Sequence, residues 1–103
     1  MKPFLTAVAA LSLLCTSSVF AEDASELAKA KNCMACHSVD TKLVGPSYKD
    51  VAEKYAGEDD VVSHLAKSIK EGSSGTWGPV PMPPNAVSDE EAEALATWIS
   101  GLE

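Results

Sequence analysis

A C-x-x-C-H pattern at residues 33–37 constrains this chain more than any other feature of its sequence. Two residues separate Cys33 from Cys36, and His37 follows directly, which is the signature of covalent haem attachment. Each thiol can add to one vinyl group of a porphyrin, and the adjacent imidazole then faces the iron. We therefore predict one haem c per chain, attached through Cys33 and Cys36, with His37 as an iron ligand.

Two other uses of a cysteine pair fit the sequence less well. A thioredoxin-like redox pair lies beside a βαβ pattern, and no segment of this chain alternates as a strand should. A structural zinc ion needs four ligands, and the further candidates are His37 and His64 alone. A covalent haem would also supply the large apolar surface that a domain of about 80 residues needs to complete its core.

The N-terminal segment 1–21 is typical of a signal peptide, with an early lysine, an apolar run at 5–15 and small residues near its end. The apolar run is shorter than the roughly 20 residues of a membrane-spanning helix. Lipid attachment to Cys15 is disfavoured because the large Leu14 precedes it. We expect a cleaved signal peptide, a domain at 22–103, and export to the periplasm without stable insertion in the membrane.

Charge excludes one class of partner. All 15 acidic residues and seven of the eight basic ones follow residue 21, so the expected domain has a net charge of −8. A nucleic acid is therefore not expected to bind.

Four segments carry apolar residues at helical spacing between recognisable start and stop signals. They begin near Asp23, after Ser47, after Asp60 and at Ser88, and they cover about 23–33, 48–57, 61–72 and 88–102. The strongest start signal is the capping box of Ser88 and Glu91. We predict an all-α domain of about four short helices.

Between the third and fourth predicted helices, the segment 72–87 contains four prolines and Met82 but no periodic pattern. Prolines on both sides of Met82 stiffen the backbone that presents it. Met82 lies far enough beyond His37 to return over the opposite face of a haem, whereas Met34 is pinned between the cysteines. His64 is the rival ligand, but it falls well off the apolar stripe of its helix and is expected to face solvent.

Met82 is thus the predicted second iron ligand. A histidine and a methionine fill both axial positions and leave none for a gas or substrate, which favours electron transfer over catalysis. Because a thioether stabilises ferrous iron, we expect a positive midpoint potential. A haem-based gas sensor or peroxidase is the main alternative, and a thiol-disulfide enzyme is a more distant one.

Three stretches of the chain, at 32–37, 41–46 and 78–85, resemble the short bacterial class I cytochromes c of the cytochrome c-551/c-552 type. The most specific of them contains Pro-Met-Pro-Pro-Asn at 81–85 and is followed by the Ser88 helix. The resemblance covers essentially the whole expected domain. It implies the small single-domain class I cytochrome c fold, wrapped around one haem, and a monomeric electron carrier.

The resemblance also implies roles around the two ligands. The carbonyl of Pro46 would accept a hydrogen bond from His37, Asn85 would bond near the Met82 sulfur, and Trp77 would reach a haem propionate. Some relatives place a cation near a propionate where this chain has Ser68. That contact would then be missing or supplied by Lys67.

Lysines are concentrated around the attachment cysteines, since 29–54 contains five lysines and three acids whereas 58–103 contains two lysines and nine acids. We expect redox proteins to dock transiently at the exposed haem edge on this side. The lysines expected to steer them are Lys29, Lys31, Lys42 and Lys49. Analogy with the family suggests a quinol-oxidising complex as electron donor and a terminal reductase or oxidase as acceptor.

Overall fold

The computed structural model describes residues 24–103, so the predicted signal peptide at 1–21 and the predicted helix start at Asp23 lie outside the described residues. The described chain folds into α2 (Ala24–Ala30), a 3-10 turn η1 (Cys33–Ala35), α3 (Tyr48–Lys54), α4 (Val61–Glu71) and α5 (Asp89–Ser100). The prediction of an all-α domain with about four short helices is confirmed. Within these residues no helix has the length and apolarity that a membrane crossing requires.

The helix termini follow the capping signals of the sequence. Ser88 and Glu91 form the predicted capping box at the start of α5, with both reciprocal hydrogen bonds present. The side chain of Ser47 accepts a hydrogen bond from the backbone N–H of Asp50 and so caps α3. Helix α4 ends at Glu71, and Gly72, which follows it, has a φ of 88°.

Two helices end earlier than predicted, and one of them is α3, which was expected to reach residue 57 but ends at Lys54. The first helix was expected to continue into Cys33, but α2 ends at Ala30 and the cysteine begins a separate 3-10 turn. The break lies at Asn32, whose φ of 62° is left-handed, a conformation that asparagine tolerates better than most residues and that cannot continue an α-helix. This turn of the backbone detaches the C-x-x-C-H segment from α2.

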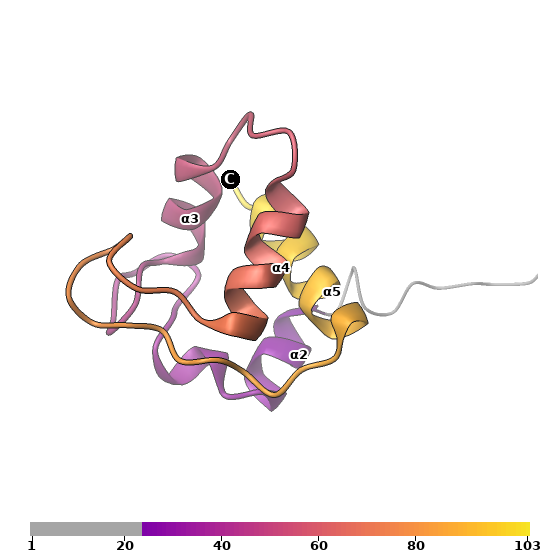
Figure 1. The fold of residues 1–103 in the computed structure, drawn as a ribbon. Coiled ribbons are helices and arrows are strands. Elements are labelled where there is room, and N and C mark those ends of the chain that lie inside the picture. The colour runs from indigo at the N-terminus through magenta and orange to yellow at the C-terminus, as the bar shows by residue number, and fades with distance from the viewer. Residues whose placement is uncertain (1–23) are drawn as a thin grey trace, which may run out of the picture.

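Helices α4 and α5 make the most extensive contact in the described chain, and α2 and α3 pack against α5 from two sides (Figure 1). Two groups of buried residues form the core. One joins α3, α4 and α5 through Tyr48, Val51, Leu65, Ala96 and Ile99. The other joins α2 to α5 through Ala24, Ala28 and Leu95. The segments 36–47 and 72–88 contribute little to these two groups. They form a side of the domain that the helical core does not fill.

Candidate haem-binding site

A cavity of about 550 Å³ opens among α3, α4, α5 and the segments 31–46 and 73–85. Its volume lies in the range of cofactor sites. The seven residues predicted to bind the haem or its iron all line this cavity: Cys33, Cys36, His37, Pro46, Trp77, Met82 and Asn85. Residues separated by up to 52 positions therefore converge on one space, which is what a shared cofactor requires.

The His37 ring is fixed by its neighbours in the Gly45-Pro46 turn. Its Nδ1 lies 2.8 Å from the carbonyl oxygen of Pro46, and since a carbonyl only accepts, Nδ1 carries the proton. The other ring nitrogen, Nε2, is then the one with a free lone pair for a metal. A Cβ at residue 45 would lie 2.6 Å from His37 Cε1, so only glycine allows this turn to approach the ring so closely.

Both cysteine thiols line the cavity, Cys33 half-buried and Cys36 exposed. Burial raises the pKa of the Cys33 thiol, an effect only partly opposed by a hydrogen bond with Tyr48. Catalytic dithiols require the opposite, a lowered pKa that provides a thiolate at neutral pH. The environment of Cys33 therefore suits a structural attachment point better than a thiol-disulfide centre.

Met82 is held by backbone contacts with the chain just beyond α4. Ser73 and Met82 exchange two hydrogen bonds, with N···O distances of 3.0 and 2.7 Å. At Gly72 a Cβ would lie 2.6 Å from the carbonyl oxygen of Met82, so the glycine permits both the positive φ and the close approach. The backbone that presents Met82 to the cavity is thus held by Ser73 and by close packing against Gly72.

The side-chain nitrogen of Asn85 donates to the carbonyl oxygens of Ile69, at 2.9 Å, and Pro83, at 3.3 Å. These bonds join the Met82 segment to the last turn of α4. The expected bond between Asn85 and the Met82 sulfur stays a prediction, because the structure records backbone partners for this amide.

Trp77 is 38% exposed at the edge of the cavity. The ammonium group of Lys54, at the end of α3, lies 5.3 Å from the centroid of the Trp77 ring, which is within the range of a cation–π contact. A cation therefore accompanies the tryptophan that was expected to reach a propionate.

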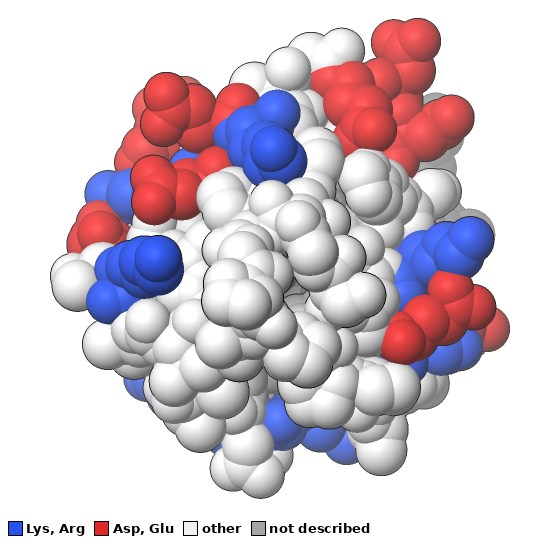
Figure 2. All heavy atoms as spheres, turned by 60° about the vertical axis from the view of Figure 1, so that its left-hand side comes forward, with Lys and Arg blue, Asp and Glu red and all other residues white. Residues whose placement is uncertain are grey.

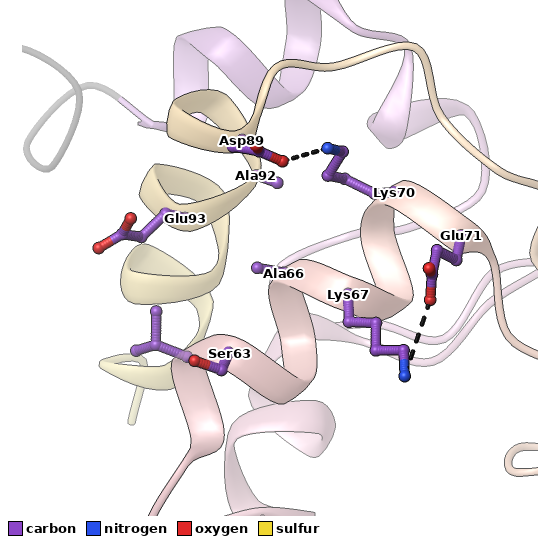
Figure 3. Close-up of a pocket in the computed structure, with 9 residues that line it drawn as sticks. Ser63, Ala66, Lys67, Lys70, Glu71, Asp89, Ala92 and Glu93 are labelled. Atoms are coloured by element: carbon purple, nitrogen blue, oxygen red, sulfur yellow. Dashed lines mark hydrogen bonds and ion pairs between the residues drawn. The ribbon is translucent and has the colours of Figure 1, made fainter.

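Ser68 and Lys67 face different spaces. Ser68 lines the large cavity, whereas Lys67 lies in a groove between α4 and α5, where it pairs with Glu71 at 4.0 Å (Figure 3). An ion pair between Lys70 and Asp89 closes one end of that groove. Lys67 is thus placed outside the cavity, and the cation recorded beside Trp77 is Lys54.

His64 does not line the cavity. Its Nδ1 lies 2.9 Å from Glu58 Oε2, its ring packs edge-on against Tyr55, and its side chain is 41% exposed. This placement agrees with the expected surface position. Met34 also lies outside the lining and packs instead against the buried residues of both core groups.

The Cytochrome c family model matches residues 21–103 of the sequence. The chain belongs to the cytochrome c family. This cytochrome is 54% identical to cytochrome c-551 of Pseudomonas aeruginosa over 100 residues, which cover 96% of each chain. It is 53% identical to cytochrome c-552 of Hydrogenobacter thermophilus over 102 residues, which cover 99% of each chain.

A solved structure supports the same assignment. Wild-type cytochrome c552 of Nitrosomonas europaea is 59% identical and superimposes with a TM-score of 0.75, covering 77% of this chain and 99% of that chain. The class I cytochrome c fold is therefore confirmed. The family resemblance seen in the sequence is confirmed as well, and so is the prediction of an electron carrier rather than an enzyme.

The cytochrome carries haem c, attached covalently through Cys33 and Cys36. The residues present fit the group, because two thiols, an imidazole with a free Nε2 and a thioether border one large cavity. When bound, the haem supplies an iron centre that gains or loses one electron. The chain supplies the attachment, the candidate axial donors and an apolar enclosure.

Two residues of this site were not identified from the sequence. Gly45 was treated as part of the Gly-Pro pair without a role of its own, and Tyr48 was assigned only to the inward stripe of its helix. In the structure Tyr48 stacks on His37, with 4.9 Å between the ring centroids. A signal for both was available in the run Gly45-Pro46-Ser47-Tyr48, where a tight turn and a helix cap place an aromatic residue beside the turn.

Proposed function

We propose that this cytochrome is a periplasmic, monomeric carrier that moves single electrons from a quinol-oxidising complex, or another donor, to a terminal reductase or oxidase. In this proposal His37 and Met82 are the two axial ligands of a low-spin haem iron. The observation that supports it is that both side chains line one cavity while backbone contacts hold each of them, through Pro46 for His37 and through Ser73 for Met82.

The surroundings of the two donors favour a carrier. Donation of the Nδ1 proton to the Pro46 carbonyl fixes the tautomer of His37 and makes Nε2 a stronger donor. A thioether from Met82 stabilises the ferrous state, so a positive midpoint potential is expected. A ligand site closed on both sides limits the rearrangement that accompanies each electron transfer.

Periplasmic location rests on the predicted signal peptide at 1–21. The family match begins at residue 21, next to the start of the predicted domain at 22, which supports a separate leader. Determining the N-terminal residue of the exported protein tests this part of the proposal, and an intact N-terminus beginning at Met1 would contradict it.

The face that carries the cavity is suited to brief protein contacts. Uncharged atoms cover its centre and charged side chains lie around its margin (Figure 2). Leu43, Val44 and Val80 are each more than half exposed, and Val44 and Val80 line the cavity. We propose that an acidic redox protein docks here over this apolar patch.

Among the four lysines expected to steer such a partner, Lys31 and Lys42 line the cavity. Lys29 pairs with Glu26, Lys31 with Glu91 and Lys49 with Asp40, which reduces the charge that these three lysines present. Replacing Lys31 and Lys42 by glutamine should slow electron transfer at low salt and flatten its salt dependence. The matched control is Lys67→Gln in the groove between α4 and α5, and equal rates in both variants would contradict this docking site.

Carbon monoxide tests the ligands directly. The reduced wild-type holoprotein should not bind carbon monoxide readily at neutral pH, whereas Met82→Leu should bind it because one axial position becomes free. Met34→Leu is the matched control, since it removes the other methionine of the domain and should behave as wild type. Ready binding by the wild type would favour a sensor or peroxidase instead.

A further inference from the structure

Tyr48 stacks directly on the imidazole of His37. The ring centroids are 4.9 Å apart and the ring planes differ by 21°, which is the geometry of an offset aromatic stack. Tyr48 is the first residue of α3, and its backbone N–H donates to the carbonyl of Ser38 at 2.9 Å. The stack therefore joins the start of α3 to the ring of His37, and the backbone hydrogen bond joins it to Ser38, the next residue in the chain.

The tyrosine itself has little freedom to move. It is 4% exposed, and Trp98 of α5 packs edge-on against it, with 5.3 Å between the centroids and 70° between the planes. Burial raises the pKa of Tyr48, so the phenol stays neutral. The Tyr48 ring is thus held between the His37 imidazole and Trp98.

We infer that Tyr48 is a positioning residue that sets the plane of the His37 imidazole relative to the haem. The Pro46 hydrogen bond fixes one nitrogen of His37, but a single bond still lets the ring rock about it. A stacked ring that is itself held by Trp98 opposes that motion. The inference rests on the proposed function, in which His37 is an axial ligand of the iron.

Electron paramagnetic resonance and proton NMR of the ferric holoprotein report the orientation of axial ligands. Tyr48→Phe keeps the stack and should leave the g values and the His37 ring-proton shifts close to wild type. Tyr48→Leu removes the stack and should shift both. Leu102→Ala is the control, because Leu102 packs against the same core group as Tyr48 but does not line the cavity, so this variant should lower stability and leave both signals in place.

A purely structural role for Tyr48 would lower the unfolding temperature of Tyr48→Leu with unchanged g values and His37 shifts, and that result would overturn the inference. Should Tyr48→Leu fail to fold, nuclear Overhauser contacts between the Tyr48 and His37 rings in reduced wild-type protein decide the matter, and their absence overturns it. Ready binding of carbon monoxide by the wild type would instead count against the proposed ligation, so the two failures are distinguishable.

Discussion

Gly45 lies against the imidazole of His37 so closely that a Cβ at residue 45 would be 2.6 Å from Cε1 and 2.9 Å from Nδ1 of the ring. The same turn brings the carbonyl of Pro46 to within 2.8 Å of Nδ1. The position of the candidate iron ligand therefore depends on the absence of a side chain one residue before the hydrogen-bond acceptor.

Replacement of this glycine should damage the site. In Gly45→Ala the methyl group must displace either the ring or the turn, and overpacking of this kind costs about 1–3 kcal/mol. The expected result is a lower free energy of unfolding together with an altered ferric spectrum, measured by denaturant unfolding and visible absorption. Gly101→Ala is the control, since its Cβ would meet nothing closer than 3.6 Å; equal effects in the two variants would refute the packing argument.

Gly72 should matter more than Gly75, a second glycine with a positive φ. Gly72 and Gly75 have φ values of 88° and 79°, and a residue with a side chain held at such a positive φ costs about 1–3 kcal/mol in backbone strain. At Gly72 the Cβ also meets the Met82 carbonyl at 2.6 Å, whereas at Gly75 nothing lies within 4 Å. We expect Gly72→Ala, but not Gly75→Ala, to let carbon monoxide reach the reduced iron. Equal carbon monoxide binding by the two variants would show that the close contact between residue 72 and the Met82 carbonyl does not hold Met82 in place.

Stability at acid pH should depend on Glu91. The backbone N–H of Ser88 donates to this carboxylate and Lys31 lies 3.5 Å away, and both lower the pKa of Glu91 from its ordinary value of 4.5. Because the pKa is lower in the folded state, this stabilisation is present above 4.5 and is lost as the pH falls through the folded-state value.

The variant Glu91→Gln can still accept the Ser88 hydrogen bond but does not titrate. The wild type should therefore melt at a higher temperature than Glu91→Gln at neutral pH, and the difference should shrink well below pH 4.5. The control is Glu90→Gln, which removes a neighbouring charge from the same turn of α5. Its difference in melting temperature from the wild type should change less with pH. A gap between wild type and Glu91→Gln that is independent of pH would contradict the assignment.

The sequence predicted the helices where local chemistry defines them. The start of α5 could be read from Ser88 and Glu91, and that of α3 from Ser47, because caps act through neighbours within one turn. The break before Cys33 was missed because the left-handed conformation of Asn32 depends on the fold around the cysteines.

The candidate donors were also predictable, since Cys33, Cys36 and His37 are adjacent in sequence and Met82 is marked by its prolines. The contacts between segments were not. Neither the stack of Tyr48 on His37 nor the pair of backbone hydrogen bonds between Ser73 and Met82 leaves a periodic signal in the sequence. Each forms only when separate segments of the chain close around one cavity.

The weak near-infrared absorption band of the ferric holoprotein, which arises from sulfur-to-iron charge transfer, tests the central claim most directly. If His37 and Met82 hold the iron between them, the band is present in the oxidised wild type at neutral pH and disappears on reduction. An oxidised protein with a full complement of covalent haem but without that band would show that Met82 is not a ligand.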